Sequence, residues 1–356
     1  FTKRERQSLG IFESILKIRC INVEKILTKR AGDKMRKMES LPLVSVIVPV
    51  YRAEKFIQQC ARSLFEQTLE EMEFIFVNDC TPDSSMVILR EIIKEYPNRA
   101  RQVRIVEHDQ NKGSATARNT GLDNARGSYI IYCDSDDWVE REMYEKMIKK
   151  AFDDKADIVG CDFYYDYVDR LVIHRQHFPN DNIQCIVELL EGKLHGSMCN
   201  KLINRKLYSL GHVRFFDGIN MWEDIVAIIS LCFYAGKIAY VSQPFYHYVQ
   251  YNSASIIRDV TTKQMDDMIY ACRNIESFFV QNNSFDKFKF HFISLVLGVK
   301  FYLVLREEVR DYNRFHCLWP EFDKDIWKIA QRWDICLIYW LASRKKYKLS
   351  RFIFRG

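Results

Sequence analysis

Three aspartates stand within four residues at Asp134-Ser135-Asp136-Asp137, directly after the apolar run from Tyr129 to Cys133. Carboxylates this close together repel one another at the end of a buried strand, unless a cation compensates their charge. Mg²⁺ and Mn²⁺ prefer oxygen ligands, typically one or two carboxylates together with substrate phosphates. The run therefore predicts a divalent-metal site. The alternative is an acidic turn that caps a helix beginning near Glu140.

Two further acids, Glu223 and Asp224, stand at the start of an apolar helical stretch. One could be a general base while the other orients a substrate hydroxyl. Acids are also favoured at a helix start by the helix dipole alone. His247, between two tyrosines, is a candidate metal or phosphate partner, although a histidine among aromatic residues more often has a structural role.

A third group of candidates surrounds Asp79 and Gly113. Asp79 ends an apolar run, where its carboxylate could accept hydrogen bonds from a base or a ribose. The residues from Asn111 to Asn119 form a turn of small side chains that leads into a helix. Small residues allow close approach of a ligand, and Arg118 could pair with a phosphate. Close packing of a helix on a sheet would explain the same small residues.

These candidates follow the ends of predicted strands. Between residues 44 and 133, short β-branched runs alternate with helical stretches. We expect strands over 44–49, 74–77, 103–106 and 129–133, with helices over 53–66, 84–96 and 114–124. Such alternation implies a parallel sheet with right-handed crossovers. Ligands of these sheets bind beyond the carboxyl ends of the strands, so the polar side chains should converge there.

Beyond residue 155 the pattern is mixed, with strands expected over 158–164, 171–176 and 238–241 and a helix over 222–234. From about 261 onward only helical periodicity remains. We therefore expect three parts: a basic amphipathic helical segment over 1–40, with its helix at 11–30, an α/β domain over 41–258, and a helical C-terminal region over 259–356. The aromatic-rich C-terminal helices could form a homo-oligomer interface.

Charge is concentrated at the two ends of the chain. The net charge is +6, yet residues 1–40 hold eleven Lys/Arg against five Asp/Glu, and residues 344–356 hold six Lys/Arg and no acid. Aromatic and aliphatic residues interleave with the bases of the last segment. An anionic membrane surface fits this pattern better than nucleic acid does. A solvated basic tail is the simpler alternative.

The cysteines and the apolar runs bear on location. Eleven cysteines, an odd number without CxxC pairs, favour buried thiols in a reducing cytosol over a disulfide framework. The longest apolar run, Phe292 to Leu305, is interrupted by Lys300 and falls short of the roughly 18 residues of a membrane span. We therefore expect a cytoplasmic protein, peripheral at most on the inner face of the cytoplasmic membrane.

Taken in order, several segments over about residues 43–255 resemble the inverting, GT-A-type glycosyltransferases of family 2, which serve bacterial capsule, O-antigen and exopolysaccharide synthesis. The segments are Val46-Ile47-Val48-Pro49-Val50-Tyr51, Val77-Asn78-Asp79-Cys80-Thr81-Pro82-Asp83-Ser84, Asn111-Lys112-Gly113 with Ala117-Arg118-Asn119-Thr120-Gly121, Asp134-Ser135-Asp136-Asp137-Trp138, Asn200-Lys201-Leu202 and Glu223-Asp224. The resemblance implies a Rossmann-like mixed sheet flanked by helices.

The resemblance also implies a role for each matching residue. Donor binding would fall to a group of residues from the strand ends, with Arg118 near the base or diphosphate and Asp134 at the ribose. Asp136 would bind Mn²⁺ or Mg²⁺, and Asp224, beside Glu223, would deprotonate the acceptor hydroxyl. The donor-binding group comprises Pro49, Tyr51, Asp79, Asn111, Gly113, Arg118 and Asp134.

The sequence departs from the family pattern in two places. The usual Asp-Asp-Gly-Ser motif is Asn78-Asp79-Cys80-Thr81 here, so we take Asp79 as the functional acid. The Gln-x-x-Arg-Trp motif of processive synthases is absent, since Gln331-Arg332-Trp333 is shorter. We therefore expect transfer of a single sugar, from a UDP-sugar, to a glycan or lipid-linked glycan.

Two rival functions remain. A nucleotidyltransferase that makes a nucleotide sugar would use a similar sheet and similar acids, but it would usually have a Gly-rich basic loop after its first strand. Residues 51–55 contain no glycine at that place. A non-catalytic sugar-binding module is the second rival, and the acids at both Asp136 and Asp224 argue against it.

Overall fold

The computed structural model describes residues 41–252, 260–329 and 332–355. The chain divides into Phe1–Leu41 and Pro42–Gly356, and the description below concerns the second unit. The predicted basic helix over 11–30 lies outside the described residues. Its existence therefore stays a prediction.

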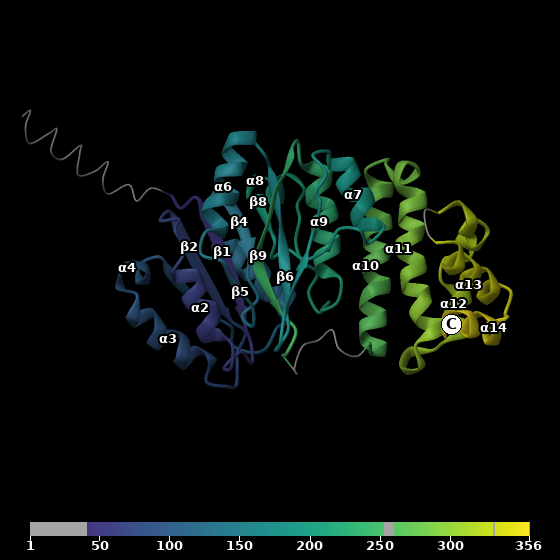
Figure 1. Cartoon of the computed structure of the whole chain (residues 1–356), viewed down its shortest axis with the longest axis horizontal. Coiled ribbons are helices and arrows are strands. Elements are labelled where there is room, and N and C mark those ends of the chain that lie inside the picture. Colours follow the sequence, from purple (N-terminus) through teal and green to yellow (C-terminus); the bar gives the residue numbers. More distant parts are fainter. Residues whose placement is uncertain (1–40, 253–259, 330–331, 356) are drawn as a thin grey trace, which may run out of the picture. The chain divides into compact units, whose positions relative to one another are not determined.

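A nine-stranded mixed sheet runs through the first two thirds of this unit, in the order β3-β2-β1-β4-β8-β6-β9-β5, with β7 paired to β6 (Figure 1). The first four strands are parallel, as predicted, while β8 runs antiparallel to both β4 and β6. The bounds are β1 Val44–Val50, β2 Met72–Asn78, β3 Val103–Glu107, β4 Tyr129–Tyr132, β5 Trp138–Val139, β6 Ile158–Asp166, β7 Leu171–His174, β8 Lys201–Asn204 and β9 Ile238–Val249. The predicted mixed α/β fold is confirmed.

Helices cover both faces of the parallel strands. Gly121 of α5 lies against Ile47 of β1, with no room for a Cβ, while Phe65 of α2 packs edge-on against Phe74 and Phe76 of β2. Because Ile47 and Phe74 point to opposite faces of the pleat, α5 and α2 flank the sheet from opposite sides. The bounds are α2 Ile57–Phe65, α3 Ser85–Glu95, α4 Pro97–Ala100, α5 Ser114–Asn124, α6 Met143–Asp154, α7 Asn182–Leu190, α8 Lys206–Leu210 and α9 Glu223–Tyr234.

Strand order fixes where the site must lie. β1 sits between β2 and β4, so the chain leaves β1 toward one side of the sheet and reaches β4 on the other. Such a switch point opens a crevice beyond the carboxyl ends of the strands. Val50, Asn78 and Tyr132 end β1, β2 and β4 at this edge.

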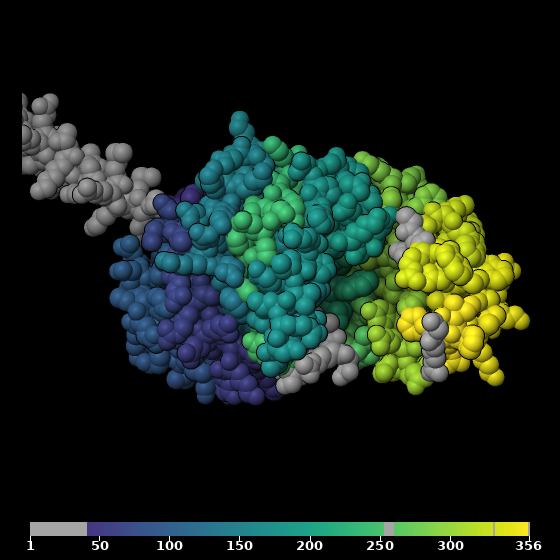
Figure 2. Space-filling model, in the orientation of Figure 1, coloured from purple at the N-terminus to yellow at the C-terminus, as the bar shows by residue number. Residues whose placement is uncertain are grey.

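The C-terminal region is helical, as predicted from residue 261 onward, and its last helices, in yellow, lie at the surface in Figure 2. A Thr261–Gln264 capping box starts α10, which packs beside α11. The bounds are α10 Thr262–Gln281, α11 Phe285–Leu305, α12 Tyr312–Cys317, α13 Trp333–Ser343 and α14 Tyr347–Arg355, with three short 3-10 turns between α11 and α13.

In the described part of the chain, α11 is one helix that is long and apolar enough to cross a membrane, contrary to the sequence expectation. Its most apolar window is nevertheless 61% buried in the protein. Lys300, in this helix, is fully buried and donates hydrogen bonds to Leu318 O and to Asp323, each at 2.8 Å. Core helices pass the same length test, so the helix is weak support for a membrane span.

Candidate active site

Arg118, in α5, binds three carboxylates that come from two other segments of the chain. Its Nη1 donates to Glu223 Oε1 at 2.6 Å and to Asp224 Oδ1 at 2.9 Å, and its Nη2 donates to Asp134 Oδ1 at 3.1 Å. The guanidinium is buried. A single cation thus joins the end of β4 to the first turn of α9, and it brings together three acids that the sequence placed in separate motifs.

The charges of this cluster do not balance. Burial opposes the charged form of Arg118, but the carboxylates of Asp224, Asp134 and Glu223 raise its pKa well above the ordinary value. Burial raises the pKa of Asp224 to about 7, with the negative charges of Glu223 and Asp134 adding to the shift and Arg118 opposing it. A carboxylate with a pKa near neutrality is suited to take a proton at physiological pH. Asp224 has the properties of a general base.

The start of α9 presents the two acids. Trp222, with a φ of 67°, precedes the helix in the left-handed conformation, and Glu223 and Asp224 form its first turn. Anions are stabilised there by the helix dipole. Both explanations offered by the sequence therefore hold together, because a favourable helix start also places Asp224 beside Arg118 and Asp134.

The loop over residues 195–199 closes the cluster from the side of β8. The Met198 amide donates to Asp224 Oδ2 at 3.4 Å, and Cys199 Sγ donates to Asp134 Oδ2 at 3.4 Å. The loop is held by Lys201, whose buried ammonium donates to His195 O, Ser197 O and Asn200 Oδ1. We describe Lys201 as a positioning residue, since it acts on the acids through this loop.

Asp79 has protein partners in the place where the sequence predicted a donor base. It is 3% exposed, and it accepts hydrogen bonds from the amides of Lys112 and Gly113, each at 2.8 Å. Its Oδ1 also lies 2.7 Å from His108 Nδ1. The carboxylate fixes the turn from β3 into α5, where Gly113 has a φ of +86°. Direct contact with a base stays a prediction.

Asp136 and Asp137 have different surroundings despite being adjacent. Asp136 is partly exposed and accepts from Asn252 Nδ2 at 2.8 Å, and burial together with the charge of Asp134 raises its pKa. Asp137 is buried, where it accepts from Tyr246 Oη at 2.5 Å and from the Val249 amide at 2.8 Å. Asp137 therefore ties the strand end to β9, while Asp136 remains available to a ligand.

The residues present fit a divalent cation that a substrate helps to hold. Within the described ranges no three His, Cys, Asp or Glu side chains converge as a complete metal cage. Mg²⁺ and Mn²⁺ often use only one or two protein carboxylates, with phosphates and water completing the shell. The charge of Asp134 raises the pKa of Asp136, and a cation would relieve this repulsion. Asp136 and Asp134 are the residues that would hold it.

His247 does not join these acids, which corrects its predicted metal role. Its ring stacks on Trp138 with centroids 3.3 Å apart and on Tyr164 at 4.5 Å, and its Nε2 lies 2.9 Å from Glu140 Oε1. β9 pairs with β5 at this point, which places His247 opposite Trp138. The contacts are those of a structural residue, as the simpler sequence interpretation had it.

The other predicted donor residues lie at the same edge of the sheet. Pro49 is partly buried near the end of β1, and Tyr51 just beyond it is 40% exposed, with the Arg52 guanidinium 5.3 Å from its ring. Asn111 is exposed on the turn held by Asp79. Their positions are compatible with contact to a donor, which remains a prediction.

Sequence reasoning missed four residues of the site: His108, Cys199, Lys201 as a support, and Asn252. His108 follows β3 directly, so its place at a carboxyl strand end could have signalled it. Cys199 and Asn252 reach Asp134 and Asp136 from loops more than 60 residues away in sequence, at |i−j| of 65 and 116. No spacing rule reports such contacts.

Comparison with known proteins agrees with this geometry. The family model described as "Glycosyl transferase family 2" matches residues 45–211. The putative glycosyltransferase EpsH of Bacillus subtilis is 30% identical over 257 residues, which cover 70% of this chain and 72% of EpsH. The chain belongs to glycosyl transferase family 2. The matched range holds Arg118 and Asp134 but ends before Asp224, whose place in the site rests on the geometry.

Other relatives of this family 2 chain extend beyond the matched segment. The uncharacterized glycosyltransferase EpsJ of Bacillus subtilis is 34% identical over 215 residues, 58% of this chain and 61% of EpsJ, so the chain spans less than two thirds of that relative. Among solved structures, S. aureus TarS in complex with UDP-GlcNAc superposes with a TM-score of 0.61 at 16% identity, over 87% of this chain and 90% of TarS. That likeness confirms the GT-A-like fold.

Proposed function

We propose that this protein is a metal-dependent, inverting glycosyltransferase that transfers one sugar from a nucleotide-diphosphate donor, a UDP-sugar, to a hydroxyl of a glycan or lipid-linked glycan. The observation that carries the proposal is the buried Asp224, with a pKa raised to about 7, held by the same guanidinium as Asp134. A base and a donor-binding acid on one cation place the two substrates side by side.

The chemistry assigned to these residues is a single displacement. The acceptor oxygen gives its proton to Asp224 as it bonds to the anomeric carbon, and the bond from that carbon to the nucleoside diphosphate breaks from the opposite face. Attack opposite to the leaving group inverts the configuration. A bound divalent metal would neutralise the charge of the departing diphosphate. Arg118 keeps Asp224 oriented toward the acceptor and limits its repulsion from Asp134.

A uridine donor is supported indirectly. The solved TarS structure that shares this fold is in complex with UDP-GlcNAc. At the carboxyl edge of this sheet, Tyr51 and the turn held by Asp79 offer an aromatic ring and exposed backbone to a base. We assign the base site to this part of the edge and the diphosphate to the side of Asp136.

A thermal-shift and calorimetric screen of UDP, GDP, dTDP and CMP, each with and without Mn²⁺, tests the donor assignment. Saturation at 100-fold the dissociation constant stabilises a native protein by about 2.7 kcal/mol, so a genuine donor nucleotide is visible. We expect Mn²⁺-dependent stabilisation by UDP that Asp136→Ala removes. Asp169→Ala, an exposed acid in the turn after β6, is the control that should retain it.

Product analysis separates the rival activity. A glycosyltransferase releases UDP from a UDP-sugar, whereas a nucleotidyltransferase would release pyrophosphate from a nucleoside triphosphate and a sugar phosphate. Formation of pyrophosphate would replace the proposal. Binding of sugars with neither product would favour a binding module.

We also propose that the protein contacts the inner face of a cytoplasmic membrane through α14. Leu349 and Phe352 lie one helical turn apart and are 51% and 75% exposed, although both are large and apolar. Lys345 and Lys348 lie exposed beside them. Apolar side chains flanked by bases fit an interface of anionic lipids, where a lipid-linked acceptor would be found.

A further inference from the structure

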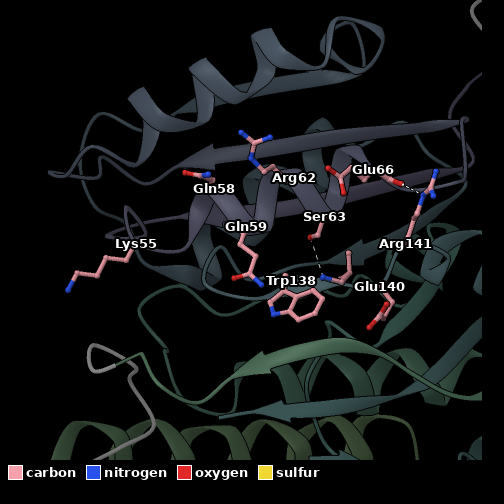
Figure 3. A pocket seen from close by; sticks show the side chains of 10 residues that line it. Lys55, Gln58, Gln59, Arg62, Ser63, Glu66, Trp138, Glu140 and Arg141 are labelled. Atoms are coloured by element: carbon pink, nitrogen blue, oxygen red, sulfur yellow. Dashed lines mark hydrogen bonds between the residues drawn. The ribbon is translucent and has the colours of Figure 1, made fainter. Parts of the chain in front are cut away.

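A second site is formed by a cavity of about 560 Å³ that shares no residue with the Arg118 cluster. It lies between the exposed side of α2 and the segment that contains β5 (Figure 3). Its size is within the range of small-molecule sites, which is roughly 300–1,000 Å³. The residues that matter below are Lys55, Gln58, Gln59, Trp138 and Glu140.

Trp138 gives this cavity a rigid aromatic wall. One face of its indole is covered by His247, at 3.3 Å between ring centroids and 12° between planes, and Tyr164 extends the stack behind His247. The indole N–H donates to Asp166 at 2.8 Å. With one face and the N–H occupied, the rest of the indole is what faces the cavity. A ring held in this way loses little entropy when a ligand packs on it.

Uncommitted polar side chains surround that ring. Gln58 and Gln59 are exposed neighbours near the start of α2, and no hydrogen bond within the described residues occupies their amides. In Figure 3 the amide of Gln59 points toward the Trp138 indole. Glu140, on the far side, gives Oε1 to His247 and retains Oε2. Each amide offers two donors and an acceptor with two lone pairs.

The charges favour a neutral ligand. Arg62 is paired with Glu95 at 2.7 Å, and the Arg141 guanidinium donates to the Glu66 carbonyl. Acidic and basic side chains are therefore mixed along the wall, without the convergent cations that phosphate recognition uses. A flat indole beside free amides suits a pyranose, which has an apolar C–H face and a rim of hydroxyls.

The cavity also adjoins the transfer site. Trp138 follows Asp136 by two residues, so their Cα atoms lie at most about 7 Å apart along an extended chain. Lys55 follows Tyr51 by four residues at the end of β1. A sugar on Trp138 would therefore lie next to the metal-binding acid and not at a remote surface.

We propose that this cavity binds a pyranose unit of the acceptor glycan, with the Trp138 indole as the stacking surface and the amides of Gln58 and Gln59 as hydroxyl partners. This inference rests on the proposed glycosyltransferase function and adds an acceptor subsite to it.

Saturation-transfer NMR of the full chain with the methyl glycosides of glucose, galactose, N-acetylglucosamine and N-acetylgalactosamine, with Mn²⁺ replaced by Mg²⁺ and UDP present, tests the subsite. We expect at least one glycoside to bind, with saturation strongest at its ring C–H groups. Trp138→Ala and Gln59→Ala should each weaken that binding about tenfold or more, as loss of a central contact does. Gln59 is exposed on α2, so its variant tests the subsite without disturbing the stack.

Trp333→Ala is the matched control, because it removes an indole that is 73% exposed on α13. It should leave glycoside binding unchanged. Stabilisation by UDP and Mg²⁺ in each variant reports an intact donor site. If UDP binds the wild type while no glycoside does, or if glycoside binding survives both Trp138→Ala and Gln59→Ala, the subsite is overturned and the proposed function stands. Failure of UDP to bind at all would instead count against the proposed function.

Discussion

Nη1 of Arg118 lies 2.9 Å from Oδ1 of Asp224, while Nη2 of the same side chain lies 3.1 Å from Oδ1 of Asp134. The sequence suggested that Arg118 would pair with a phosphate. In the structure its hydrogen bonds go to the acids instead, so its effect on a substrate is exerted through them. The guanidinium holds the predicted base and the predicted ribose-binding acid at a fixed separation.

Replacing Arg118 by methionine should therefore damage stability as well as activity. The variant leaves three carboxylates of one buried cluster without their cation, and removal of one partner from a buried ion pair typically costs about 3–5 kcal/mol. Urea denaturation would measure the free energy of unfolding. The double variant Arg118→Met with Glu223→Gln should recover part of the loss, because one repelling charge is gone. Equal stabilities of wild type and Arg118→Met would show that the cluster is not organised by this cation.

Asp224→Asn should abolish turnover while the donor still binds. Loss of a general base typically lowers the rate by about 10² to 10⁴-fold. UDP with Mn²⁺ should still raise the melting temperature of the variant, since Asp136 is intact. Transfer of sugar by Asp224→Asn at the wild-type rate would assign the base elsewhere, with Glu223 as the next candidate.

The pKa of Asp224 gives this site a pH dependence with a defined sign. Its carboxylate is the active form, so kcat/KM should rise with pH through about 7, as an apparent value of the whole cluster. The folded pKa lies above the ordinary value of 3.8, so the contribution of Asp224 to stability is fully present below about pH 3.8 and is lost as pH rises through about 7. Wild type should accordingly lose stability relative to Asp224→Asn over this interval, in urea denaturation at several pH values.

The parts of this fold that depend on local pattern were predictable. The strand over 44–50 and the helix over 114–124 follow from a β-branched run and from a Gly-led turn, and both were expected within one or two residues. β8 was missed, because four residues with Lys201 at their head do not read as a buried strand. Lys201 is tolerated at zero exposure since three oxygens satisfy its ammonium, and those oxygens come from a loop whose course depends on the completed sheet.

The site divides in the same way. Acids at strand ends were found because parallel strands bring their carboxyl ends to one edge. Their roles could not be found in the same way. Asp136 and Asp137 are neighbours in sequence, yet only contacts with Asn252 and Tyr246 show which of them is left for a ligand. His247 is structural for a reason visible only in three dimensions, namely its stack on Trp138.

Lys201→Met should impair the reaction from outside the cluster. The substitution removes the donor to His195 O, Ser197 O and Asn200 Oδ1, and each buried acceptor left without a partner costs about 1–3 kcal/mol. The loop over 195–199 should then release the amide that faces Asp224. We expect lower stability and a lower kcat with the KM for the donor little changed, measured by denaturation and steady-state kinetics. Lys206→Met, at an exposed position at the start of α8, is the control.

Glutamate at both Leu349 and Phe352 should detach the protein from anionic membranes. The double variant replaces the two exposed apolar side chains of α14 with charges of the same sign as the lipids, and each base near such a surface contributes about 1 kcal/mol of attraction. Sedimentation with vesicles of phosphatidylglycerol and phosphatidylcholine would measure the loss, which high salt should reproduce. Val168→Glu, at an 84% exposed apolar position after β6, should sediment like the wild type. Unchanged sedimentation of the double variant would refute the membrane contact, and a change in oligomeric state without lipid would identify a second copy of the chain as the partner of this face.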